Sequence, residues 1–227
     1  MARHRFFVAG TDTDVGKTLV TQGLLEAAKK SGLSCFGLKP IAAGCEKTPR
    51  GLENEDARKL MSASSVKLSY QQVNPIALEA AIAPHVAAQM ENRKLDGQRV
   101  IGFCRGAMMT KADLVLVEGA GGWRVPLNSR ETLAMLPKDL DLPVILVVGI
   151  KLGCINHALL TVESIIRDGV KLAGWVANQV DPNMSQPSDS IEYLSAAIQA
   201  PLIGTVPYLA KVEPHIVADH LQLREIL

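Results

Sequence analysis

GTDTDVGKT, from Gly10 to Thr18, is the stretch from which the rest of the chain can be interpreted. It follows the phosphate-binding pattern G-x-x-x-x-G-K-[ST], except that five residues rather than four separate its two glycines. An apolar run over Arg5–Ala9 predicts a strand before it, and the pattern of Thr18–Ser31 predicts a helix after it. A strand-to-helix turn with an incidental lysine is the alternative, but strand, glycines, Gly-Lys-Thr and helix coincide here, which favours a phosphate site.

The chemistry of such a loop depends on its backbone and on two side chains. Gly10 and Gly16 allow backbone N–H groups to turn toward phosphate oxygens, and the positive end of the following helix adds to the attraction. Lys17 would supply a point charge for the β- and γ-phosphates of a nucleotide, and Thr18 a hydroxyl for Mg²⁺.

Runs of strand length alternate with helix-length segments along the chain. Further strands are expected at Ser34–Leu38, Asp113–Val117, Val144–Gly149, Leu172–Ala177 and Leu202–Ile203, and helices at Gly153–Asp168 and Ser188–Gln199. Strands that are apolar throughout are covered on both faces, and helices between them imply parallel crossovers. The prediction is an α/β fold of the P-loop NTPase type, a single domain over residues 1–227 with a mostly parallel sheet flanked by helices. Ala43–Glu53 and Asp181–Asp189 are expected to be surface loops, and 62–84 resists assignment.

Composition excludes some classes of partner. Lys plus Arg number 24 and Asp plus Glu 23, a net charge of +1, so no bulk charge favours nucleic acid or an anionic membrane. The four cysteines form no C-x-x-C pair, which favours reduced thiols and a cytoplasmic location. The most apolar run, Val144–Ile150, is about a third of a membrane span. We therefore expect a soluble protein that binds neither nucleic acid nor membrane.

Three charged residues could complete a nucleotide site. Glu118 ends the strand DLVLVE and opens GAGG, as an acid that serves a Mg²⁺–nucleotide site would; an idle strand-end acid is the alternative. Asp56 could instead be a helix cap or first-turn residue. Lys39, fixed by Pro40 at the carboxyl end of a strand, would face the ligand crevice and neutralise charge during phosphoryl transfer. On its own, however, a lysine there is more often a solvated surface residue.

Two further segments could bind ligand groups. KLGCINHALL, Lys151–Leu160, repeats the order of strand, glycine and helix, and the helix start near Cys154–Asn156 suits a carboxylate. Asn156 as a simple cap is the alternative reading. Asn178, after the fifth strand, stands where purine-binding side chains lie in related nucleotide-binding folds.

Taken together, several segments resemble the ATP-dependent dethiobiotin synthetases, in that family's order and over nearly the whole chain. They are GTDTDVGKT, KPIAAG, NED, VNP, APH, LVEGAGGW, VILVVGIKLGCINHALL, GWVAN and GTVPYL. The first block and GCINHALLT are quite specific, whereas KP and VEGAGG alone are shared with related amidoligases.

The resemblance implies an activity. The family uses CO2 and MgATP to close a ureido ring on 7,8-diaminopelargonic acid (7,8-diaminononanoate), forming dethiobiotin, ADP and phosphate in biotin biosynthesis. It also implies a homodimer with the diamine site at the interface, and a Mg²⁺ cofactor with ATP as co-substrate.

The resemblance further implies roles for residues of this chain. Lys39 would be catalytic and would hold the carbamate, while Thr18, Asp56 and Glu118 would gather around Mg²⁺. ATP would be bound by those three together with Asp14, Val15, Gly16, Lys17, Asn178, Pro207, Tyr208 and Leu209. The substrate would be bound by Thr13, Lys39, Ala43, Gly153, Cys154, Ile155, Asn156 and Tyr193, the last five reaching across the dimer.

The sequence departs from the family pattern at two positions. Ala43 stands where the family usually has a Ser or Thr that helps to hold substrate, and Ala81 replaces a proline. Loss of one substrate hydrogen bond weakens binding by roughly 0.5–1.5 kcal/mol. A divergent paralogue with altered substrate use is therefore an alternative. A P-loop switch ATPase of the partitioning or maturation type is another, although the loop lacks the lysine near its start that many of those carry. A larger amidoligase and a non-catalytic nucleotide-binding module are the remaining ones.

Overall fold

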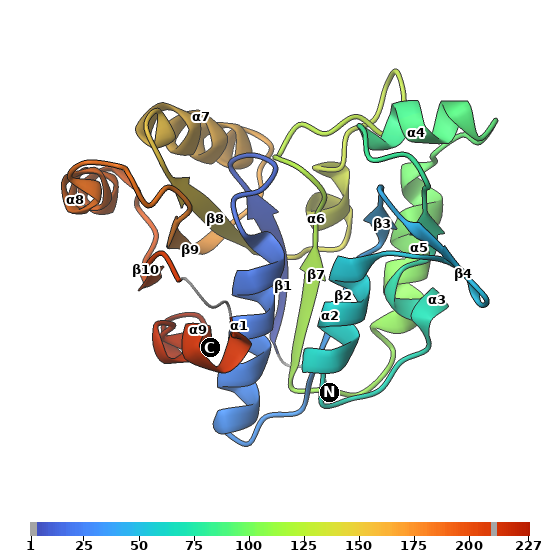
Figure 1. The fold of residues 1–227 in the computed structure, drawn as a ribbon, viewed down its shortest axis with the longest axis horizontal. Coiled ribbons are helices and arrows are strands. Elements are labelled where there is room, and N and C mark those ends of the chain that lie inside the picture. Colours follow the sequence, from blue (N-terminus) through green and yellow to red (C-terminus); the bar gives the residue numbers. More distant parts are fainter. Residues whose placement is uncertain (1–3, 210–212) are drawn as a thin grey trace.

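Among residues 4–209 and 213–227, which a computed structural model describes, six parallel strands form the central sheet (Figure 1). Their order across the sheet is β10-β9-β8-β1-β7-β2. Their bounds are β1 His4–Gly10, β2 Cys35–Leu38, β7 Leu114–Glu118, β8 Val144–Ile150, β9 Leu172–Gln179 and β10 Leu202–Val206. The predicted parallel α/β fold is confirmed.

Helices cover both faces of this sheet, which explains why its strands are apolar throughout. Every residue of β7 and β8 is buried. One face packs against α1 (Lys17–Lys30), α2 (Glu55–Ala63) and α9 (Pro214–Asp219). The other packs mainly against α4 (Pro84–Met90), α5 (Gly97–Ala107), α6 (Met135–Asp139), α7 (Cys154–Arg167) and α8 (Pro187–Ala197). A short 3₁₀ turn, Leu223–Glu225, follows α9.

One predicted loop and the unassigned stretch both contain small elements. The stretch 43–53, predicted to be a loop, contains an antiparallel hairpin of β4 (Glu46–Thr48) and β5 (Gly51–Glu53), so that prediction was wrong in part. The stretch 62–84 holds α3 (Tyr70–Val73) and β6 (Ile76–Ala77), which pairs with β3 (Ile41–Ala42). Strands of two or three residues lack the periodicity by which a longer strand is recognised.

The strand order places a ligand crevice beside β1. From β1 the chain crosses to β2 on one side, whereas from β8 it proceeds to β9 and β10 on the other. Ligands of open α/β sheets bind at the carboxyl ends of the strands where the winding direction changes. The loop that follows β1 lies at this point, at the top of Figure 1. Within the described ranges no helix has the length and apolar character needed to cross a bilayer.

Candidate active site

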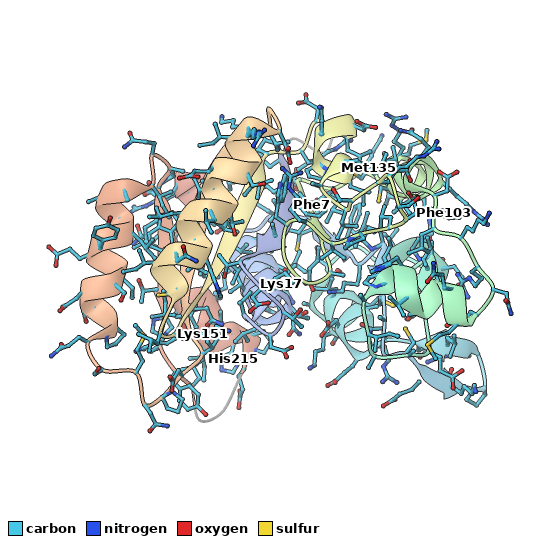
Figure 2. All side chains as sticks on the ribbon, turned by 90° about the horizontal axis from the view of Figure 1, so that it is seen from above. Phe7, Lys17, Phe103, Met135, Lys151 and His215 are labelled. Atoms are coloured by element: carbon cyan, nitrogen blue, oxygen red, sulfur yellow. The ribbon has the colours of Figure 1, made fainter. Side chains whose placement is uncertain are left out.

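A pocket of about 890 Å³ opens at the carboxyl ends of the central strands. Figure 2 looks onto this end of the sheet, with Lys17 near the middle and Lys151 at the start of α7. The phosphate loop forms one side of the pocket and two small-residue segments form the other. Its lining comprises Thr13, Asp14, Gly16–Thr18, Lys39, Ala42, Ala43, Asn54, Asp56, Ala81–Pro84, Ala120–Gly122 and Arg124–Pro126.

The loop of GTDTDVGKT is held in an unusual backbone conformation. Asp14 and Gly16 have φ values of 56° and 85°, in the left-handed region. Asn178, buried at the end of β9, donates a hydrogen bond from Nδ2 to the Val15 carbonyl over 2.8 Å. A Cβ on Gly16 would lie 2.1 Å from that same Nδ2, so only glycine fits. The Asn178 amide, expected near adenine, therefore braces the phosphate loop in this structure.

Lys17 is buried beneath the loop. Its ammonium donates to the Asp12 carbonyl over 2.9 Å, and Lys17 is the first residue of α1. Burial, and then the nearby charge of Lys39, lower the pKa of Lys17 to about 8. An anion at this position would stabilise the charged form and offset the effect of burial. The geometry therefore suits a phosphate group beside Lys17.

Lys39 lies between two carboxylates next to the loop. Its Nζ is 2.6 Å from Glu118 Oε1 and 3.5 Å from Asp56 Oδ2, and it donates to the Gly119 carbonyl over 3.0 Å. Burial opposes the charge on Lys39, but Glu118 and then Asp56 outweigh it and raise the pKa of Lys39. Lys39 is 5% exposed and Glu118 is fully buried, so neither is an idle surface residue.

Hard oxygen donors gather around this lysine. Thr18 Oγ1 donates to Glu118 Oε1 over 2.7 Å, while Glu118 Oε2 is buried and has no hydrogen-bond partner among the described residues. Asp56, in the first turn of α2, lies on the same side of the pocket. Two carboxylates and a hydroxyl are ligands that Mg²⁺ prefers, and the unpaired oxygen leaves an acceptor for it. The predicted ligands fit this ion.

The two departures from the family pattern lie next to each other. Ala43 and Ala81 both line the pocket, and a Cβ on the intervening Gly44 would lie 3.2 Å from the Ala81 Cβ. The Gly44 N–H also donates to the Ala80 carbonyl over 3.1 Å. Because both substitutions remove bulk or polarity from one wall, their effects on a ligand there are expected to be coupled.

Several expected ligand-binding residues lie outside this pocket. Gly153–Asn156 begin α7, and Tyr193, on α8, is 55% exposed. The start of α7 approaches the loop through Lys151, whose Nζ is 3.4 Å from Asp12 Oδ2. Pro207–Leu209 follow β10, where the Tyr208 N–H donates to the Gln179 side chain. Within one subunit these groups do not join the residues around Lys39.

Two polar side chains that line the pocket were not predicted as site residues. Asn54 caps α2 by accepting from the Ala57 N–H, and its Nδ2 donates to the Ala43 carbonyl over 3.3 Å. The sequence signal was an Asn directly before a helical segment. Arg124 lies in the glycine-rich segment after β7 and pairs with Asp168, 44 residues along the chain. No local sequence pattern predicts an ion pair between residues this far apart in the chain.

Comparisons with solved structures identify the fold. MinD of Pyrococcus horikoshii OT3, a septum site-determining protein complexed with Mg-ADP, matches with a TM-score of 0.56 at 14% identity, over 99% of this chain and 89% of that one. FtsY of Elizabethkingia anophelis, a signal recognition particle receptor, matches with a TM-score of 0.52 at 16% identity, over 95% and 64%. At these identities the similarity establishes the P-loop fold alone.

Sequence comparisons are more specific. A family model described as an AAA domain matches residues 4–215. The ATP-dependent dethiobiotin synthetase BioD of Cellvibrio japonicus is 55% identical over 100% of this chain and 99% of its own. That of Marinobacter nauticus is 52% identical over the same shares, and that of Vibrio parahaemolyticus is 44% identical over 98% and 97%. With its phosphate loop, buried lysine and paired carboxylates in one pocket, the chain belongs to the family of ATP-dependent dethiobiotin synthetases.

Proposed function

We propose that this protein is the ATP-dependent ligase of biotin biosynthesis that converts 7,8-diaminononanoate and CO2 into dethiobiotin. The observation that carries the proposal is the buried ammonium of Lys39, held between Glu118 and Asp56 beside the phosphate loop. Relatives named dethiobiotin synthetases share about half of the sequence over its full length, which supports the same chemistry here.

The proposed reaction has three steps. One amine of the diamine attacks CO2 and loses a proton, which gives a carbamate. A carbamate oxygen then attacks the γ-phosphorus of ATP, and ADP leaves. The second amine attacks the carbonyl carbon of the resulting mixed anhydride, so that phosphate leaves and the ureido ring closes. The protein's task is to align these groups and to neutralise their negative charge.

The phosphate loop would hold the nucleotide. Backbone N–H groups of Asp14–Thr18, at the start of α1, would surround the phosphates. The ammonium of Lys17 would neutralise charge on the β- and γ-phosphates. These phosphates would in turn offset the effect of burial, which lowers the pKa of Lys17. Asn178 would frame adenine while its Nδ2 keeps the hydrogen bond to the Val15 carbonyl. Pro207, Tyr208 and Leu209 would lie along the other edge of the base.

Mg²⁺ would be held by Thr18, Glu118 and Asp56. When bound, the ion would neutralise negative charge during phosphoryl transfer. In this structure the ammonium of Lys39 already lies between the two carboxylates. We propose that Lys39 turns from them toward the carbamate and the γ-phosphate when ligands fill the pocket. It would then be the catalytic cation, because it contacts the reacting oxygens.

The diamine would occupy the remaining half of the pocket. Thr13 lines that half together with Ala43 and the adjacent segment Ala81–Pro84. Its carboxylate would be bound by Gly153–Asn156 and Tyr193 of a second subunit, since these groups lie outside the pocket of their own chain. Two exposed leucines offer apolar surface for such a homodimer: Leu152, just before α7, is 91% exposed, and Leu160, within α7, is 56% exposed.

The same proposal covers the remaining properties. One domain over residues 1–227 would carry the whole activity, and the cytoplasm would be its location, consistent with four free, buried cysteines. The partitioning-type switch has no support from the comparisons, because the likeness to MinD concerns the fold only.

Substitution of Lys39 by Met tests the assignment. With ATP binding verified by calorimetry, we expect the variant to lose ureido product formation by two or more orders of magnitude. The matched control is Asp219→Asn on α9, which breaks an exposed ion pair with Lys30 of α1 and should leave turnover unchanged. Product formation by Lys39→Met at the wild-type rate would remove Lys39 from its catalytic role.

A further inference from the structure

One wall of the pocket is built from a segment with little conformational preference of its own. Residues 119–126 follow β7 and contain three glycines, of which Gly121 has φ = 60°. Glycine gains the most freedom in an unfolded or mobile chain, so a segment of this kind needs external anchors to keep one shape. Its first anchor is the Gly119 carbonyl, which accepts from Lys39, and its last is a bridge between Pro126 and Thr132.

A single carboxylate anchors the middle of the wall. Asp168, directly after α7, accepts from Trp123 Nε1 at Oδ2 and from the Arg124 guanidinium at Oδ1, each over 2.8 Å. The Asp168 side chain is 20% exposed, and Trp123 is 4% exposed. Both oxygens of one residue therefore hold two consecutive side chains, 44 and 45 positions away along the chain.

The Trp123 ring connects the Asp168 contact to the central sheet. It packs edge-on against Phe7 of β1, with 6.4 Å between ring centroids and 82° between planes. A Cβ on Gly119 would lie 2.9 Å from the Phe7 ring, so the backbone of the wall also rests on this side chain. Figure 2 labels Phe7 near Lys17. Trp123 is thus packed against β1 as well as bonded to Asp168.

The wall in turn lies against the lengthened phosphate loop. A Cβ on Gly122 would be 3.6 Å from the Thr11 carbonyl oxygen, and one on Gly121 would be 3.6 Å from Thr13 Oγ1. In the proposed function this part of the loop, around Thr13, faces the diamine, whereas the phosphates are held farther along, by Asp14–Thr18. A displaced wall would alter that half first.

We propose that Asp168 is a positioning residue for the diamine site. It acts through Trp123 and Arg124, fixes the glycine-rich wall against the phosphate loop, and contacts no ligand itself. This inference rests on the proposed function for the identity of the ligand. The anchoring contact itself does not depend on it.

The test compares Asp168→Asn with wild type. An amide oxygen can still accept from one donor, but its NH2 group faces the other, so the wall loses an anchor without losing volume. We expect the KM for the diamine to rise roughly 5- to 20-fold, while the KM for ATP changes less than about twofold, because misplaced walls weaken orientation locally. The near-UV circular dichroism of Trp123 should weaken in parallel.

Two further variants make the outcome decisive. Trp123→Phe keeps the ring on Phe7 but removes the donor, and combined with Asp168→Asn it should raise the diamine KM no further than the worse single variant. Arg124→Gln, which removes the half-exposed ion pair and also alters a side chain that lines the pocket, should raise the diamine KM as well, and combined with Asp168→Asn it should raise that KM further than either single variant. Asp219→Asn, remote on α9, should have none.

The contrary results are distinct. A fall in melting temperature with an unchanged diamine KM would reduce Asp168 to a structural role, and equal rises in both KM values would contradict a local effect. If wild-type protein formed no ureido product, the proposed function would fail. The anchor would then be judged by the Trp123 signal alone, and an unchanged signal in Asp168→Asn would overturn it.

Discussion

Removing the Lys39 charge should destabilise the protein before any ligand is added. Glu118 has no exposed surface, and its Oε1 is 2.6 Å from the Lys39 ammonium. In Lys39→Met the carboxylate keeps only the Thr18 hydroxyl as a partner. Breaking a buried ion pair by removing one partner costs about 3–5 kcal/mol. Each kcal/mol lowers the melting temperature of a chain of this size by about 2–4 °C, so a fall of roughly 10 °C is expected.

A second substitution separates stability from catalysis. Lys39→Met combined with Glu118→Gln removes the unpaired charge, and an amide can still accept from Thr18, so most of the lost stability should return. Product formation should not return, because the cation and a proposed Mg²⁺ ligand are both missing.

Thermal and urea unfolding of wild type, Lys39→Met and the double variant, without nucleotide, measure these differences. A matched Lys30→Met, which breaks an exposed pair with Asp219, should change stability by less than about 1 kcal/mol. Wild-type stability of Lys39→Met, or a double variant no more stable than the single one, would refute the view that the buried pair of Lys39 and Glu118 stabilises the fold.

Three further substitutions probe the loop and the wall. Lys17→Met should stabilise the ligand-free protein by about 3 kcal/mol at pH 7, because burial lowers the Lys17 pKa from 10.5 to about 8 and each pKa unit corresponds to about 1.4 kcal/mol. The gain should vanish as pH rises from 8 to 10.5, and a destabilised variant in unfolding titrations at pH 7 would contradict this. Gly16→Ala should weaken ATP binding at least tenfold by calorimetry, because φ = 85° is costly for alanine and its Cβ would displace Asn178; near wild-type affinity would show that the loop adapts. Ala43→Ser should lower the diamine KM about threefold to tenfold by restoring a hydroxyl to the pocket wall, whereas an unchanged KM would mean that a neighbour already compensates.

Much of the site could be predicted because its parts lie at the ends of strongly apolar strands. β1 and β7 are recognisable from composition, and parallel strands bring their carboxyl ends to one edge of a sheet. Lys17 and Glu118, 101 positions apart, are therefore expected to meet; Lys17 lines the pocket, and Glu118 is buried directly behind it, bonded to Thr18 and Lys39. The positions of these side chains could be predicted, but their burial could not, because a residue at the end of a strand can be either buried or exposed.

What could not be predicted depends on distant side chains. The brace from Asn178 to the Val15 carbonyl spans 163 positions, and the anchor from Asp168 to Trp123 spans 45. Neither pair has a characteristic spacing, because each arises from tertiary packing of loops. The β3–β6 pairing, with two residues in each strand, likewise has no periodicity to detect.

The central claim is that phosphoryl transfer in this pocket is tied to ring closure. Purified protein is supplied with MgATP, bicarbonate and 7,8-diaminononanoate, and both phosphate and the product's mass are measured. The account predicts one phosphate for each product in which a carbonyl bridge has replaced two amine hydrogens, and little phosphate when the diamine is omitted. Rapid phosphate release without the diamine, and no ureido product with it, would contradict the account.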